Sequence, residues 1–221
     1  MNFLLKVIIL ISIDVLLFYK FGFLAGIIGL PIIIWRILLI FGITKKITFF
    51  KGPFIKGTVF LKDYQGSYYK SKPAFEEANN IIKSFNLQNY SIIGVYYDKP
   101  GETDESKLRY SIGIYKKNLD KPDSSLESYC NSKDYYYAEL PDSNCLYSSW
   151  DYSNLFAMML GISKFNFGLK QKLKDADFKK TFRIKDTDCK IIVELYDNNS
   201  SIKFFAPLTN VEQFQLYKKD K

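Results

Sequence analysis

The sequence contains no histidine and only three cysteines in 221 residues. Without an imidazole, the chain cannot form a Ser-His or Cys-His nucleophile pair, and no histidine can ligate a metal or haem. Cys130, Cys145 and Cys189 are odd in number and form no CxxC pair, which favours reduced thiols over a disulfide framework. No zinc-finger, helix-turn-helix or RNA-recognition pattern accompanies the net charge of +8. Metals, cofactors and nucleic acids are therefore not expected partners.

The N-terminal part of the chain is unusually apolar. Residues 7–43 carry only Asp14, Lys20 and Arg36 as charged side chains. The stretch 21–43 is long enough to span a membrane, whereas 7–19 alone is short, and the apolar run continues past the end of a signal peptide. We predict that residues 1–44 form a membrane anchor. Two arrangements stay open: a single span, or a helical hairpin in which Asp14 and Arg36 face each other inside the protein.

Lysines cluster directly after the apolar segment, at positions 45, 46, 51 and 56. Basic residues next to a membrane segment favour the cytosolic side. We therefore expect the remainder of the chain to face the cytosol.

From residue 56 onward, one order of elements occurs twice. The pattern predicts strand, helix, strand, strand at 57–66, 71–85, 90–101 and 107–117, and again at 145–150, 151–175, 189–197 and 201–208. Polar residues 119–134 are expected to form a loop, and residues 134–141 an added edge strand. The fold class is therefore α+β, a duplicated β-α-β-β unit with one antiparallel sheet and two helices. Chance similarity of short apolar strands is the alternative reading of the repeat.

One strand of this repeat carries an acid. "IIVELYD" (191–197) aligns with "IIGVYYD" (92–98) so that Glu194 falls on Val95 and Tyr196 on Tyr97. Alternation along a strand then predicts that Glu194, Tyr196 and Tyr97 share one face of the sheet. A carboxylate in apolar surroundings costs several kcal/mol, roughly, unless it is paired, protonated or solvated. Glu194 is thus either a solvent-facing residue of an edge strand or the floor of a binding cleft.

Three stretches carry a resemblance to a known superfamily: "GVYYDKP", "KLRYSIG" and "ELYDNNSSIKFFAPL". They resemble signature segments of GyrI-like domains, which include gyrase-inhibitory proteins, effector-binding domains of drug-responsive regulators and SOUL proteins. With the N-terminal apolar segment, the chain is most similar to membrane-anchored, testis-expressed GyrI-like proteins that act as receptors for autophagy of the endoplasmic reticulum. The resemblance covers residues 45–210 and leaves 211–221 as a short basic tail.

The resemblance implies a site and a role. In GyrI-like domains a glutamate on this strand lies in the central cleft and meets cationic or amphipathic ligands, a position that Glu194 occupies here. Tyr97, Tyr196 and Trp150 are the aromatic residues expected to surround the ligand. The receptor proteins also carry an acidic, disordered tail with an autophagy-adaptor motif, which this sequence lacks after its last strand. The autophagy role and its adaptor-protein partner are thus implied only by the resemblance.

Three functions compete on this reading. The leading one is a membrane-anchored, cytosol-facing binding or adaptor protein of the endoplasmic reticulum that is not an enzyme. Some GyrI-like relatives hydrolyse reactive small molecules, and Glu194 with Tyr97 or Tyr196 would then act as acid or base. A nucleic-acid or damage-repair adaptor that uses the basic surface is the third. Turnover that depends on Glu194, or salt-dependent DNA binding, would separate these alternatives from the first.

Overall fold

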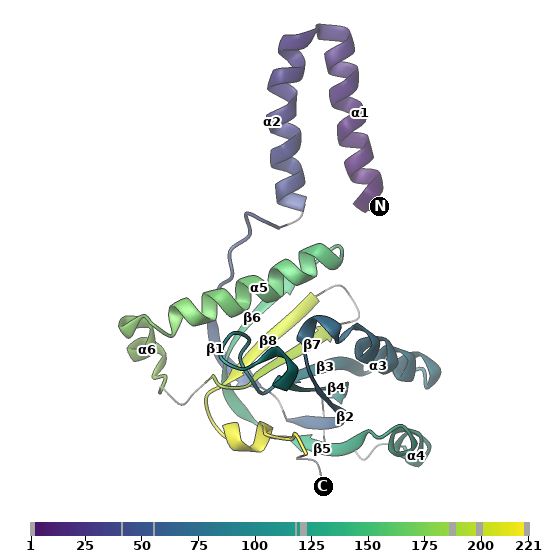
Figure 1. Cartoon of the computed structure of the whole chain (residues 1–221), viewed down its shortest axis with the longest axis vertical. Helices are drawn as coiled ribbons and strands as arrows, with labels where there is room; N and C mark the ends of the chain where they lie inside the picture. The colour runs from purple at the N-terminus through teal and green to yellow at the C-terminus, as the bar shows by residue number, and fades with distance from the viewer. Residues whose placement is uncertain are drawn as a thin grey trace. The chain divides into compact units, whose positions relative to one another are not determined.

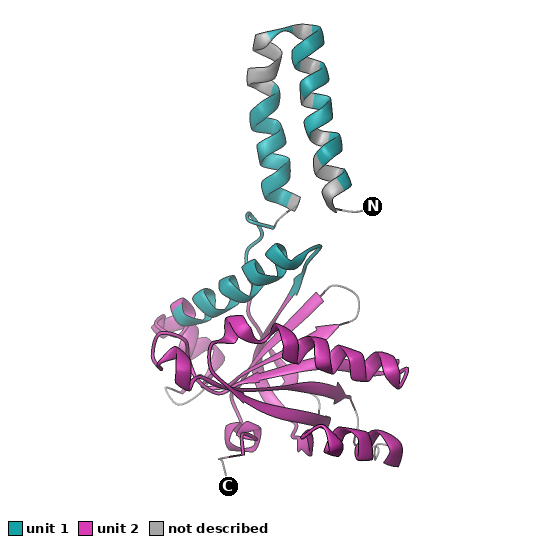
Figure 2. Cartoon of the chain, turned by 45° about the vertical axis from the view of Figure 1, so that its right-hand side comes forward, with its two compact units in different colours: residues 1–47, 150–170 teal, residues 48–149, 171–221 magenta. Residues whose placement is uncertain are grey.

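A computed structural model describes residues 3–40, 42–54, 56–117, 119, 123–185, 189–197 and 201–218. The chain divides into two compact units, shown in Figure 2: unit 1 consists of residues 1–47 and 150–170, and unit 2 of residues 48–149 and 171–221. In this division residues 150–170 group with the N-terminal helices, and the predicted boundaries after residues 44 and 210 stay a prediction.

Unit 1 begins with a helical hairpin (Figure 1). Helix α1 (Phe3–Phe21) and helix α2 (Phe23–Ile40) are joined at Gly22, which has the left-handed φ of +78° that glycine tolerates best. Pro31 lies inside α2. Among the residues that the structure describes, no helix is long and apolar enough to cross a membrane. The predicted approach of Asp14 to Arg36 lies outside the described side chains.

The chain forms an eight-stranded sheet in the order β1-β6-β8-β7-β3-β4-β2-β5. Pairing is antiparallel between β1 and β6, β2 and β4, β2 and β5, β3 and β4, β3 and β7, and β7 and β8. The strands are β1 (Phe50–Phe54), β2 (Gly57–Gln65), β3 (Tyr90–Tyr96), β4 (Arg109–Lys116), β5 (Tyr136–Leu140), β6 (Ser143–Asp151), β7 (Ile192–Asp197) and β8 (Ser201–Pro207). The α+β class and the antiparallel sheet agree with the prediction, and β5 is the expected edge strand.

The duplication is visible in the order of the strands. The first copy runs β2, α3 (Lys72–Ser84), β3, β4, and the second runs β6, α5 (Leu155–Lys172), β7, β8. In the sheet the first copy reads β3-β4-β2 and the second β7-β8-β6, so the two copies meet at the β3–β7 pair. This mirrored order is that of a pseudo-twofold, as the repeated sequence pattern predicts. Residues 198–200, between β7 and β8, lie outside the described residues.

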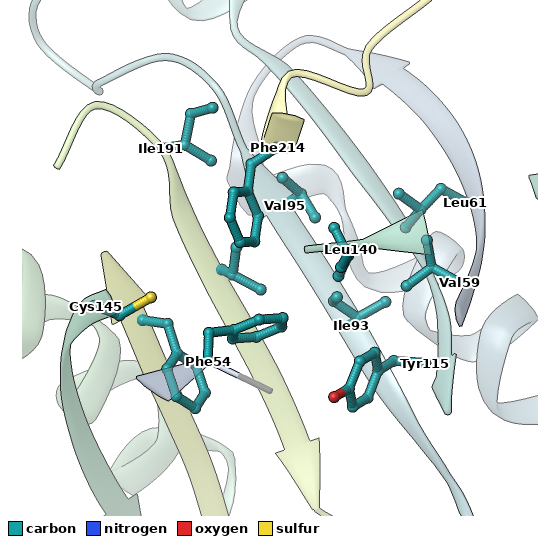
Figure 3. Close-up of a cluster of buried hydrophobic side chains, with 12 residues drawn as sticks. Phe54, Val59, Leu61, Ile93, Val95, Tyr115, Leu140, Cys145, Ile191 and Phe214 are labelled. Carbon is teal, nitrogen blue, oxygen red and sulfur yellow. The ribbon is translucent and has the colours of Figure 1, made fainter. Parts of the chain in front are cut away.

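The two faces of the sheet carry separate apolar cores in unit 2. On one face, α3 and α4 (Ser124–Ser132) cover a cluster that includes Phe60, Ile112 and Ile114. On the other face, Ile93, Val95 and Val193 pack with Phe54 and Phe214, as Figure 3 shows in part. Phe214 belongs to a 3-10 helix at Val211–Phe214 and is fully buried. Residues predicted as a basic tail therefore close one side of the core.

Among the described residues, one strand and two α-helices were not predicted. Helix α4 lies within the segment expected to be a loop, and the strand β1 and the helix α6 (Ala176–Phe182) have no counterpart in the prediction. Helix α4 forms because Asp123 caps it by accepting from the backbone N–H of Ser125, while Leu126 and Cys130, four residues apart, turn one face inward. The polar residues around these two conceal a short amphipathic pattern.

Candidate ligand-binding site

The candidate site lies where the two copies of the repeat meet. Glu194 is at the middle of β7, paired with Gly94 of β3 on one side and with Phe204 of β8 on the other. It is an interior strand residue and is only 2% exposed. The reading of Glu194 as a solvent-facing edge residue is therefore wrong.

The register corrects the predicted alignment of the two copies by one residue. Residues that pair across an antiparallel ladder share a face, so Glu194 shares its face with Gly94, and Ile192 shares that face with Tyr96. A pseudo-twofold axis perpendicular to the sheet places equivalent residues of the two copies on the same face of the sheet. Glu194 is thus equivalent to Gly94 rather than to Val95, and Tyr196 is equivalent to Tyr96.

Two tyrosines donate to the buried acid. The Tyr196 hydroxyl lies 2.5 Å from Glu194 Oε2. Tyr96, from the equivalent position of the first copy, also hydrogen-bonds the carboxylate. Gly94 makes room for this arrangement, since a Cβ at that position would lie 3.0 Å from the Tyr96 ring. The two copies therefore contribute one tyrosine each to a single acid.

Burial dominates the electrostatics of this cluster. Desolvation raises the pKa of Glu194 to about 7, although the hydrogen bonds from Tyr196 and Tyr96 act in the opposite direction. Desolvation, and next the charge of Glu194, raise the pKa values of Tyr96 and Tyr196 well above the ordinary range. Near neutral pH the acid is close to half ionised, while both phenols remain neutral donors.

No described lysine or arginine forms an ion pair with Glu194. Around the acid the surroundings are aromatic: the Phe75 ring of α3 lies 4.8 Å from the Tyr196 ring, and the fully buried Phe204 is the β8 neighbour. Tyr96 and Phe75 are themselves only partly buried. An ionised Glu194 thus has hydrogen-bond donors but no counter-charge from the part of the chain that the structure describes.

Tyr97 does not belong to this site, contrary to the prediction. Successive residues of a strand alternate between faces, so Tyr97 lies on the side opposite to Tyr96 and packs with the Val95 and Val193 cluster. Its hydroxyl lies 2.9 Å from Ser111 Oγ, and its ring packs edge-on against Tyr217. The error follows directly from the one-residue shift in the alignment.

Trp150, the fourth predicted residue, belongs to unit 1 and is buried there. Its indole Nε1 donates to the Ala157 carbonyl over 2.8 Å, and a Cβ on Gly161 would collide with its ring. The ammonium groups of Lys45 and Lys164 lie 4.9 Å and 5.4 Å from the ring centroid. A ligand-binding role of Trp150 stays a prediction.

A second polar cluster, on the Tyr97 face, was not anticipated. Asp63 of β2 accepts at Oδ1 from Ser111 Oγ (2.6 Å) and the Tyr136 hydroxyl (2.8 Å), and at Oδ2 from the backbone N–H of Lys218 (2.8 Å). Tyr136 is also 3.0 Å from the Leu216 carbonyl. These bonds tie the C-terminal segment to the sheet. Asp63 and its three donors come from four separate parts of the sequence, so no local pattern could have revealed the cluster.

Within the described residues, no group of three or more histidine, cysteine, aspartate or glutamate side chains is arranged to hold a metal ion. A surface pocket formed by described residues is lined by Lys56, Leu119, Glu139, Leu140, Pro141 and Gln213. None of these belongs to the Glu194 cluster.

Comparison with known proteins gives weak structural likenesses only. No protein-family model and no curated protein matches the sequence. Among solved structures, SAV2435 bound to tetraphenylphosphonium is 10% identical over 76% of this chain and 98% of its own, with a TM-score of 0.46. The EcmrR C-terminal domain is 9% identical over 73% and 96%, with a TM-score of 0.43. A hydrolase from Listeria innocua is 10% identical over 74% and 93%, with a TM-score of 0.44. Likenesses at this level assign no function to the chain.

Proposed function

We propose that the sheet domain is a GyrI-like binding domain whose ligand is a small lipophilic cation, recognised by Glu194 with Tyr96 and Tyr196. One observation carries the proposal: a fully interior carboxylate at the junction of the two copies has two phenol donors and, among described residues, no cationic partner. Leaving a buried acid without a counter-charge costs stability. Such costs are typical of binding sites, where the ligand supplies the missing charge.

The aromatic surroundings define the ligand class. A soft, delocalised cation loses little hydration free energy on entry and is attracted to ring faces, whereas a compact ammonium is strongly hydrated. Phe75, Tyr96 and Tyr196 supply such rings next to the acid. We propose that the ligand enters past Phe75 and Tyr96, since both side chains are partly exposed.

Tetraphenylphosphonium is a suitable probe because its charge does not titrate. Binding to the full chain, measured by isothermal calorimetry between pH 5 and 9, should strengthen as pH rises and level off above about pH 7, where Glu194 is ionised. Below that pH, a ligand that requires the carboxylate loses about tenfold in affinity per pH unit.

The chain offers a matched control. Glu139 on the edge strand β5 is also two residues from a tyrosine, and it accepts from the Tyr137 hydroxyl over 3.2 Å, but it is exposed. Glu194→Gln should abolish binding and its pH dependence, whereas Glu139→Gln should change neither. Equal affinity of both variants and the unchanged chain would refute the proposal.

We also propose that the α1–α2 hairpin associates with a membrane. What supports this is the exposure of its apolar side chains, among them Val15, Leu16, Ile32 and Trp35, each more than half exposed. Exposed apolar surface of this extent marks an interaction site for a membrane or another protein. Full-length protein should float with lipid vesicles, and Leu16→Lys with Ile32→Lys should weaken flotation more than Tyr69→Lys, which changes an exposed residue of unit 2. Unchanged flotation of the double variant would contradict the proposal.

The resemblance and the lysines after the hairpin extend this proposal to an adaptor of the endoplasmic reticulum that faces the cytosol. Asn89 of the Asn-Tyr-Ser sequon is exposed and would be reachable by the glycosylation machinery in the lumen. We expect Asn89 to stay bare in cells. A glycosidase-sensitive mass shift that disappears in Asn89→Gln would place the domain on the lumenal side instead.

A further inference from the structure

Helix α5 is apolar on two sides. Its inner side chains Ala157, Gly161, Phe165 and Leu169 are buried, at spacings that form one continuous stripe. The outer positions Phe156, Met159 and Phe167 form a second stripe and are 53%, 45% and 64% exposed. An ordinary surface helix places polar residues on its outer side. The outer stripe of α5, defined by these three residues, therefore presents more apolar surface than the outer side of an ordinary surface helix.

The charges of α5 indicate which partner. The helix carries Lys164, Lys170 and Lys172 and not one acidic residue. The rest of unit 1 has the same bias: residues 1–47 and 150–170 contain seven lysines and arginines but only Asp14 and Asp151 as acids. An apolar stripe bordered by lysines is typical of helices that lie in the interface of an anionic bilayer.

Contacts inside unit 1 join α5 to the end of the hairpin. The Lys164 ammonium donates to the carbonyl oxygens of Gly42 (3.1 Å), Ile43 (2.6 Å) and Lys45 (2.6 Å), directly after α2. The ring of Trp150 lies 3.0 Å from where a Gly42 Cβ would be. Any surface that receives the hairpin therefore comes close to α5 as well.

We infer that α5 lies in the headgroup region of an anionic membrane, with Phe156, Met159 and Phe167 directed into the acyl boundary and Lys170 toward the phosphates. The inference rests on the proposed membrane association of the hairpin and adds a second contact, formed by a helix of the duplicated sheet domain. Its consequence is that one of the two repeat helices, α5, binds lipid.

Introduced cysteines can test this in the full chain, because the native Cys130, Cys145 and Cys189 are all buried. Single variants Phe156→Cys, Phe167→Cys, Ile32→Cys and Tyr69→Cys are labelled with an environment-sensitive fluorophore. Each is then mixed with vesicles of phosphatidylcholine and phosphatidylserine, with or without bromine on the acyl chains. Labels at 156 and 167 should shift to shorter wavelength and lose emission to the brominated lipid. The label at 69 should do neither.

The outcomes separate the two claims. Quenching at 32 without quenching at 156 and 167 keeps the membrane association of the hairpin and overturns the inference about α5. No quenching at 32, 156 or 167 overturns both. If the labels at 156 and 167 shift in the absence of vesicles, in step with a concentration-dependent rise in molecular mass, a second copy of the chain covers the stripe and the inference is wrong.

Discussion

The Tyr196 hydroxyl donates to Glu194 Oε2 over 2.5 Å, from a position two residues further along the same strand. Side chains two apart on a strand lie on the same face, so this bond requires no distant element to bring the groups together. What the fold adds is burial, through α3 on that face and through pairing with the central strand of the other copy. The hydrogen bond and the desolvation act on the acid in opposite directions, and desolvation is the larger effect.

This balance predicts a pH-dependent stability. The folded pKa of Glu194, about 7, exceeds its ordinary value of 4.5, so the folded state holds a proton that the unfolded state releases between these values. The contribution of Glu194 to stability is therefore largest below about pH 4.5 and falls as pH rises to about 7. The contribution of Glu194 to this fall is about 2–3 kcal/mol. Glu194→Gln should remove it, as measured by urea unfolding at several pH values. If the variant and the unchanged chain lose stability in parallel, the acid does not titrate as described.

A glycine opposite the acid provides a second prediction. An alanine Cβ at position 94 would press on the flexible end of the Tyr96 side chain at 3.0 Å, whereas at position 113 it would meet the Phe60 carbonyl oxygen at 1.8 Å, which is backbone. Gly94→Ala should cost about 1 kcal/mol as the ring moves, and Gly113→Ala several kcal/mol because the β2–β4 ladder must part. Chemical unfolding midpoints give the comparison. The reverse ranking would show that the Tyr96 ring cannot move.

Strands β3 and β7 show how much of the candidate site could be predicted from the sequence. The order of elements in each copy was readable because strand alternation, helix caps and turn residues are local signals. The register was not, since "IIGVYYD" and "IIVELYD" also match when shifted by one residue, with Ile92 on Ile192 and Tyr96 on Tyr196. Only cross-strand pairing decides between the two alignments, and a shift by one exchanges Tyr96 for Tyr97 at the acid. Glu194 and Tyr196 could be predicted to lie side by side because they are two residues apart on one strand.

The Asp63 cluster predicts a role for the C-terminal segment. Asp63→Ala would leave the Ser111 and Tyr136 hydroxyls without their shared acceptor and free the backbone N–H of Lys218. Losing hydrogen bonds to a charged acceptor costs about 1–3 kcal/mol, so the variant should be less stable by about that amount. Proteolysis should also release residues near 215–218 sooner than in the unchanged chain. Asp104→Ala, which changes an exposed acid that caps a 3-10 helix, is the control and should leave cleavage near 215–218 unchanged.

The last prediction concerns the connection between the hairpin and α5. The three carbonyl groups that Lys164 binds follow the C-terminus of α2, where orphan acceptors remain and a cation is favourable. Lys164→Met keeps the length of the side chain but removes all three hydrogen bonds. We expect proteolysis of the full chain at Lys45 and Lys46 to accelerate, because the local opening that exposes this segment becomes easier. The unfolding midpoint of the sheet domain should stay nearly constant.

Lys170→Met changes an exposed lysine six residues along the same helix and should leave the cleavage rate unchanged. Equal cleavage of both variants and the unchanged chain would mean that Lys164 does not hold the hairpin to α5, and the membrane contact inferred for α5 would lose its structural link.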